Sequence, residues 1–426
     1  MIRARGPYGH AAIETMPFRP PTTAECNRRE SVGRIFLIFL RLGLSSFGGP
    51  VAHLGYFRDE FVVRRRWLDE ARYADLVALC QLLPGPASSQ TGMALGMGRR
   101  GYRGALAAWA GFTLPSAVVM VLFALGLARH GELLPSAVLH GLKIVAVAVV
   151  AQAVWGMARS LCADAPRVTL MALAASMMLA RPGAATQIGV ILAAGLVGLR
   201  WFRPERSRAD ERVDDPHPVG RGRLAGIVWL GVFGACLIGL PILTRSLAAP
   251  TLAVIDAFFR AGALVFGGGH VVLPLLQAAV VPNGWVDEQV FLAGYGAAQA
   301  VPGPMFTFAA FLGASLQVGP SGWSGGLLCL VAIFAPSFML IASALPFWEA
   351  LRRNARLRAA LAGINAAVVG LLLAALYDPV WTSAIEAPRD FTLALLTFVA
   401  LMFWKWPPWW VVVAGSLISW LMSALM

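Results

Sequence analysis

Long apolar runs recur along the chain and restrict it to folds that span a membrane. About 18 apolar residues in a helix cross the hydrocarbon core of a bilayer. The runs lack the period-two alternation of transmembrane strands, so they predict helices rather than a β-barrel. The runs that carry this prediction are Leu106–Leu127, Val138–Trp155, Leu224–Leu243, Gly325–Leu345, Leu357–Leu376 and Phe391–Trp404.

Composition supports an all-α polytopic integral membrane protein and argues against other classes. Hydrophobic residues make up 58% of the 426-residue chain and charged residues 13%, whereas soluble domains carry about 25% charged residues. The net charge of +13 comes mainly from Arg in short loops, which is typical of membrane topology rather than of nucleic-acid binding. The five scattered Cys predict buried apolar side chains, and no pattern indicates a disulfide, metal site or cofactor.

An internal repeat divides the chain into two copies, because three blocks recur in the same order with the same spacing. The first copy has Arg41-x-Gly43-x3-Phe47-Gly48-Gly49, then Trp67-x-Asp69-Glu70-x10-Gln81-x2-Pro84-Gly85-Pro86, then Gly101-x2-Gly104-x-Leu106-x8-Pro115-Ser116. The second copy has Arg260-x-Gly262-x3-Phe266-Gly267-Gly268, then Trp285-x-Asp287-Glu288-x10-Gln299-x2-Pro302-Gly303-Pro304, then Gly322-x2-Gly325-x-Leu327-x8-Pro336-Ser337.

Charge in matching loops predicts that the two copies have opposite orientations in the membrane. Segments 58–72 and 99–103 are rich in Arg, whereas their partners 276–288 and 320–324 contain no Lys or Arg. Since positive loops stay in the cytoplasm, the copies are predicted to be inverted, as in many secondary transporters. The expected organisation is a disordered cytoplasmic leader 1–33, a first repeat 34–200, a cytoplasmic linker 201–223, an inverting helix 224–244 and a second repeat 250–426.

Glycine and proline interrupt four apolar segments and predict broken, re-entrant helical hairpins. Each repeat is expected to start with two of these hairpins, followed by about four transmembrane helices. The breaks fall at Ser45–Pro50, Pro84–Pro86, Gly267–Gly269 and Pro302–Pro304, where Pro removes a donor and Gly allows unusual φ. Irregular backbone at membrane depth is tolerated where it is buried in protein or lines a cavity. The N-termini of the half-helices would point free N–H groups at the midplane, an arrangement that favours an anion.

The duplicated blocks resemble the CHR (chromate ion transporter) family in its long, two-domain form, over roughly 34–200 and 250–405. This resemblance implies efflux of chromate from the cytoplasm across the cell inner membrane, and hence chromate resistance. It implies no enzymatic activity. Some members of the family are assigned to sulfate handling. The second copy departs from the pattern at Gly269, which stands in place of Pro50.

Candidate substrate-binding residues lie at or beside the four breaks. Arg can bind a tetrahedral oxyanion with two hydrogen bonds, and hydroxyls and amides at a helix start can bind it too. Snorkelling, capping and packing stay open as alternatives for each of them. The candidates are Arg41, Ser45, Ser46, Gly48, Gly49, Gln81, Pro84, Gly85, Pro86, Ser88, Ser89, Arg260, Gly267, Gly268, His270, Gln299, Pro302, Gly303, Pro304 and Thr307.

Three other functions remain open at this stage. Import of sulfate or another oxyanion would need a coupling ion, for which no carboxylate site is evident. An anion channel could use the same architecture. An intramembrane enzyme would need a dyad with an orienting group, and His53 with Ser45 or Ser46 lacks one. Monomer and homo-oligomer are both compatible with the sequence.

Overall fold

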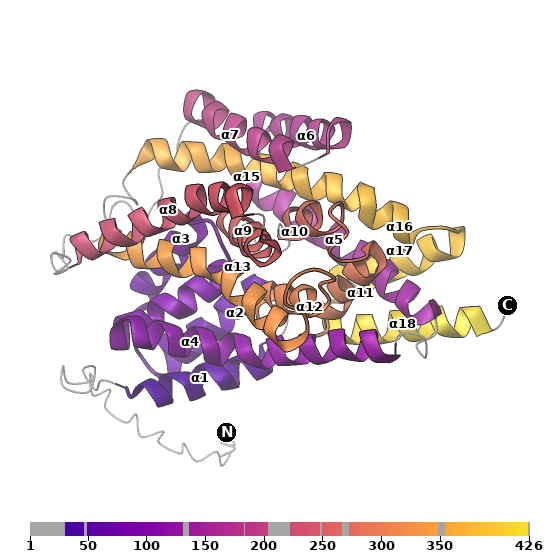
Figure 1. Cartoon of the computed structure of the whole chain (residues 1–426), viewed down its shortest axis with the longest axis horizontal. Coiled ribbons are helices and arrows are strands. Elements are labelled where there is room, and N and C mark those ends of the chain that lie inside the picture. The colour runs from indigo at the N-terminus through magenta and orange to yellow at the C-terminus, as the bar shows by residue number, and fades with distance from the viewer. Residues whose placement is uncertain are drawn as a thin grey trace, which may run out of the picture.

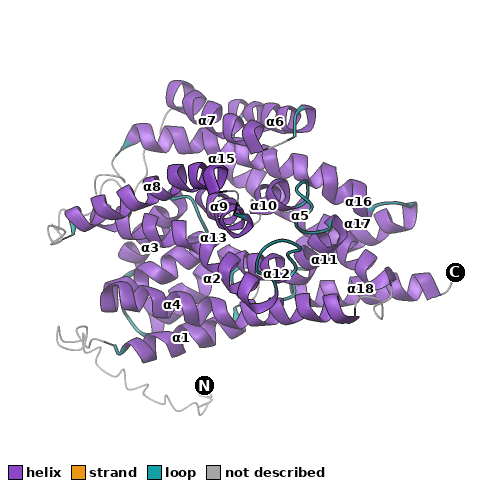
Figure 2. Cartoon of the chain, in the orientation of Figure 1, coloured by secondary structure: helices purple, strands orange, loops and turns teal. Residues whose placement is uncertain are grey.

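The computed structural model describes residues 30–46, 49–130, 136–182, 184–202, 222–247, 249–265, 272–347 and 354–424, and these form helices joined by short loops and turns. No strand occurs in this part of the chain (Figure 2). The all-α fold class is therefore confirmed. Most of the predicted leader and linker, together with Gly48, Gly267, Gly268 and His270, lies outside the described residues.

The helices of the first repeat follow the apolar segments and end at the predicted breaks. α1 ends at Ser45 and α2 begins at Gly49, and α3 ends at Leu82 before α4 begins at Ala87. α4 runs through the predicted loop 99–103 but bends there, because Arg100 and Gly101 leave helical geometry. The bounds are α1 Val32–Ser45, α2 Gly49–Arg58, a π-helical turn Asp59–Arg64, α3 Glu70–Leu82, α4 Ala87–His130, α5 Ser136–Leu161, α6 Ala165–Ala180 and α7 Ala184–Trp201.

The second repeat has the same order of elements, preceded by α8. Asp69 caps α3 and Asp287 caps α11, each by accepting a backbone N–H with its carboxylate. The bounds are α8 Arg223–Leu247, α9 Pro250–Ala263, α10 Val272–Val280, α11 Glu288–Ala298, a 3₁₀ turn Met305–Thr307, α12 Phe308–Ala314, α13 Gly322–Ala344, α15 Ala355–Ala375, a π-helical turn Leu376–Trp381, α16 Thr382–Ala384, α17 Pro388–Met402 and α18 Pro408–Ala424.

Five helices of the described residues are long and apolar enough to cross a membrane: Ala87–Arg129, His140–Arg159, Arg223–Leu247, Gly322–Phe347 and Ala355–Ala384. Shorter apolar helices include Ala165–Ala180 and Pro408–Met422. Large apolar side chains such as Leu37, Leu192 and Leu224 are exposed, as expected of a surface that faces lipid rather than water. The chain is thus a polytopic membrane protein.

Equivalent helices of the two repeats make equivalent packing contacts. α1 lies along α4, and α9 lies along α13 (Figure 1). α5 packs against α17 and α18 of the second copy, whereas α15, at the matching position, packs against α6 and α7 of the first. Each repeat therefore buries the helix that follows its long span α4 or α13 against the last two helices of the other repeat, and the two copies form one core.

Close helix contacts in this core occur at glycines. A Cβ on Gly96 would overlap the carbonyl of Gly104, and in the second copy a Cβ on Gly313 would overlap the carbonyl of Gly325. Small residues that let backbones touch are the usual means of helix association in membranes. The Gly-x2-Gly block of the sequence therefore places the N-terminal half of α4, and likewise α12, directly on the following span.

Candidate functional site

Beside the helix breaks, each repeat contacts the other through a backbone hydrogen bond. The N–H of Gly85 donates to the carbonyl of Val265 at 2.6 Å, and the N–H of Gly303 donates to the carbonyl of Ser46 at 2.9 Å. Thus each Pro-Gly-Pro break binds the end of the first half-helix of the opposite copy.

Left-handed backbone explains why glycine stands at these two positions. Gly85 has φ of +122° and Gly303 has φ of +102°, which side chains rarely adopt. A Cβ on Gly85 would also overlap the hydroxyl of Ser337, and a Cβ on Gly303 would overlap that of Ser116. The Pro-Ser block of each copy therefore touches the Pro-Gly-Pro break of the other, a role that the sequence did not reveal.

A polar network lies within the first repeat beside these contacts. His53 on α2 has Nε2 3.2 Å from the carbonyl oxygen of Ser46 and Nδ1 3.5 Å from Oγ of Ser88. The amide of Gln90 donates to the carbonyl of Pro84 at 2.7 Å. His53, Ser46, Ser88 and Gln90 are at most 2% exposed, so the network is sealed from the surface.

The N-terminus of α4 supplies several buried hydrogen-bonding groups to this network. The N–H of Gln90 makes the first helical bond, to Pro86, so the N–H groups of residues 87–89 point out of the helix end. The hydroxyls of Ser46, Ser89 and Ser337 and Oε1 of Gln90 are buried without a hydrogen-bond partner among the described residues. Such groups are costly to bury unpaired. The three hydroxyls are donors and, together with the positive end of a helix, suit an oxyanion, whereas the acceptor oxygen of Gln90 does not contribute to such binding.

The second repeat has no matching polar network in its described part. At the repeat positions of Ser46, His53, Ser88 and Gln90 it has apolar side chains, and all of them are buried in the core: Val265, Val272, Phe306 and Phe308. Thr307, at the repeat position of Ser89, donates its hydroxyl to the carbonyl of Pro304 at 2.9 Å. The candidate site is therefore one-sided.

Several residues predicted from the sequence lie away from this network. Arg41 and Ser45 are exposed on α1, where Ser45 donates to the carbonyl of Arg41 at 2.9 Å. Gln81 is also exposed, and Gln299 directs its amide to the sulfur of Met305 at 3.7 Å. Gly49, with φ of +76°, begins α2 and is half-buried.

Arg260 lies in a separate pocket of about 210 Å³ between α7, α8, α9 and α10. Its guanidinium contacts the carboxylate of Asp256, four residues earlier on α9, at 2.5 Å. Asp256 is buried and Arg260 is partly exposed.

Comparison with known proteins agrees with the motifs and with the geometry. The family model described as chromate transporter matches residues 33–199 and 252–420. The chain is 30% identical to a chromate transport protein of Pseudomonas aeruginosa, over 88% of each chain. It is 28% identical to a probable chromate transport protein of Synechococcus elongatus, over 88% of this chain and 90% of the relative. An uncharacterized transporter of Methanocaldococcus jannaschii is 29% identical over 82% of this chain and 85% of that protein.

No solved structure matches this chain. The matched ranges cover the two sequence repeats and leave out the whole of α8, so the family model recognises both copies. The resemblance expected from the duplicated motifs is thereby confirmed: the chain belongs to the chromate transporter family.

Proposed function

We propose that the protein exports chromate, a tetrahedral dianion, from the cytoplasm as a secondary transporter, and thereby confers chromate resistance. The observation that carries this proposal is the set of buried hydroxyls of Ser46, Ser89 and Ser337, which have no hydrogen-bond partner in the described chain and lie next to helix breaks, beside the N-terminus of α4. Relatives that bear the name chromate transport protein cover most of the chain.

The chemistry of the network suits this substrate. Ser46, Ser89 and Ser337 offer hydroxyl donors from α1, α4 and α13, and the helix end adds N–H groups and a positive dipole. Elements of both repeats therefore surround the proposed site. Movement of one repeat against the other would break the two inter-repeat bonds of Gly85 and Gly303 and open the site to one side.

The membrane potential suffices to drive export. Moving one charge across a potential of 100 mV is worth about 2.3 kcal/mol, so a dianion leaving a negative interior gains about 4.6 kcal/mol. No ATP site is needed for this direction, whereas import of sulfate would run against the same potential.

Chromate uptake into everted vesicles with a positive interior tests the proposal. Export in the cell becomes accumulation in such vesicles, and the wild type should accumulate chromate in proportion to the imposed potential. Ser89→Ala should reduce uptake by about tenfold, the value of one charge-assisted hydrogen bond. Ser176→Ala is the matched control, because Ser176 bonds only its own helix at Ala172 and is exposed.

Excess sulfate in the same assay measures selectivity between the two dianions. Competition by sulfate with transport of both ions would broaden the substrate class to tetrahedral oxyanions. Absence of wild-type chromate uptake at every imposed potential would sink the export proposal. Flux far above carrier rates, without saturation, would indicate a channel instead.

A further inference from the structure

A second cluster of charged residues lies apart from the central network, at the end of the molecule where α17 and α18 meet the start of α5 (Figure 1). A pocket of about 390 Å³ opens there. Side chains from four helices and the turn before α17 line it, and those that carry charge or hydrogen-bonding groups are His140, Lys143, Gln289, Glu386, Arg389, Asp390 and Ser419.

Lys143 is the residue of this pocket that most clearly indicates a ligand. It lies in the apolar run of α5, is only 8% exposed, and has no ion pair or hydrogen bond among the described residues. A charged side chain within a membrane segment is expensive and is usually paired or functional. The chain contains only one other Lys, Lys405, and uses Arg elsewhere.

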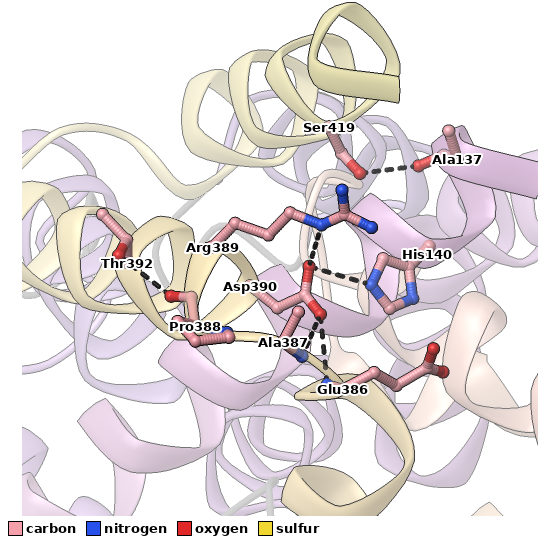
Figure 3. Close-up of polar contacts among 9 residues, drawn as sticks. All are labelled: Ala137, His140, Glu386, Ala387, Pro388, Arg389, Asp390, Thr392 and Ser419. Atoms are coloured by element: carbon pink, nitrogen blue, oxygen red, sulfur yellow. Dashed lines mark hydrogen bonds and ion pairs between the residues drawn. The ribbon is translucent and has the colours of Figure 1, made fainter. Parts of the chain in front are cut away.

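The carboxylate of Asp390, in contrast, is already satisfied (Figure 3). Its Oδ2 accepts the N–H groups of Glu386 and Ala387 at 3.1 and 2.9 Å, as in a capping box. Its Oδ1 lies 3.2 Å from Nε2 of His140 and 3.9 Å from Nε of Arg389. Asp390 thus holds α17 against α5, and these donors occupy both of its oxygens.

Glu386 also lines the pocket, but it is exposed to solvent. Water and salt screen an exposed carboxylate, whereas a buried ammonium is screened much less. Arg389 is exposed and screened in the same way, so the buried charges of the pocket are those of Lys143 and Asp390, and of these two Lys143 is the one without a partner among the described residues. The volume would hold roughly a dozen waters at about 30 Å³ each, enough for a small hydrated ion.

We propose that this pocket binds a tetrahedral oxyanion through Lys143, with Arg389 and Gln289 as further donors. By the charge rule for loops, the pocket opens to the outer face of the membrane. The inference rests on the proposed function in one respect: it gives the exported ion a second binding site outside the central network. Binding itself can be tested without transport.

A cysteine placed in the pocket reports its occupancy. In a chain whose five native Cys are replaced by Ala, Met422→Cys, which lines the pocket without being one of the proposed donors, is modified in intact cells by a membrane-impermeant methanethiosulfonate that carries a sulfonate. Added sulfate should slow this reaction, and chloride at equal ionic strength should not. Ser324→Cys, exposed at the start of α13 on the same proposed side, is the control whose rate sulfate leaves unchanged.

The charge of Lys143 decides the result. Lys143→Met should raise the sulfate concentration for half-protection about 10- to 100-fold, the value of one charge-assisted hydrogen bond. Lys143→Arg should preserve protection, which also shows that the site tolerates substitution. Glu386→Gln should lower the half-protecting concentration, because it removes the opposing charge.

Two outcomes would overturn the inference. One is the absence of protection by sulfate in the parent chain, and the other is protection that is unchanged by Lys143→Met. Chromate export by the same cells separates the two proposals. Export without protection removes the outer site alone, whereas protection without export removes the proposed function and retains the site.

Discussion

At the scale of single residues, repeat-related positions have different partners. Oγ of Ser116 donates to the carbonyl of Pro302 at 2.5 Å, whereas Oγ of Ser337, at the same place in the other copy, is buried without a partner in the described chain. One serine therefore stabilises the fold, and the other is available to a ligand.

The two serines should respond in opposite ways to alanine. Ser116→Ala leaves a buried carbonyl unsatisfied and should cost about 1–3 kcal/mol of stability. Ser337→Ala removes an orphan hydroxyl, so its stability should change by less than about 0.5 kcal/mol, while chromate transport falls. Thermal unfolding in detergent, measured beside vesicle uptake, separates the effects. Equal destabilisation by both substitutions would show that Ser337 has a structural partner.

Sequence reasoning found part of the site at this scale. The four breaks were predictable because Gly and Pro have strong backbone preferences. The second repeat has Val265 at the position equivalent to Ser46, which indicates that the polar groups of the two repeats differ. The network of His53 was not predictable, because a single His beside a break is more often structural. Lys143 was hidden inside an apolar run, although a lone charge in such a run is itself a signal.

At the scale of elements, α8 is the helix without a counterpart in the first repeat. The sequence predicted it at 224–244 as the helix that inverts the second copy, and the structure has α8 at Arg223–Leu247. It packs against α9 and α13. Gly226 allows this contact, since a Cβ there would lie 2.9 Å from the ring of Phe347 and 3.0 Å from the carbonyl of Ser343.

Bulk at Gly226 should therefore separate α8 from the second repeat. Gly226→Leu should destabilise the protein by about 1–3 kcal/mol through overpacking, seen as a lower unfolding temperature. Gly234→Leu in the same helix is the control, because a Cβ at Gly234 meets nothing within 4 Å, and it should be neutral or stabilising. If both variants unfold alike, the helix is not held at Gly226.

At the scale of the whole molecule, the proposed inversion of the two repeats makes a direct prediction. Arg103 and Ser324 occupy equivalent, exposed positions at the start of a long span. On the charge rule Arg103 lies in the cytoplasm and Ser324 outside. In the cysteine-free chain, an impermeant maleimide should label Ser324→Cys in intact cells, and label Arg103→Cys only after permeabilisation. Labelling of both from the same side would exclude inverted repeats.

The helix order and the break positions were accessible from the sequence, but the way the copies interlock was not. In the sequence, α5 and α15 are apolar runs that could pack against any neighbouring helix. Apolar membrane helices lack the charge pattern by which a soluble surface indicates its partner. Only the assembled structure places α5 on α17 and α18, and α15 on α6 and α7.

This exchange of helices has a consequence for biosynthesis. A ribosome adds about 5–20 residues per second, and α5 is synthesised long before α17 and α18. The helix α5 is therefore without these partners for on the order of ten seconds or more. Lys143 and the start of α5 spend that interval among lipids or beside an insertase. We therefore expect nascent chains stalled before α17 to be protease-sensitive around α5, and full-length chains to be protected there.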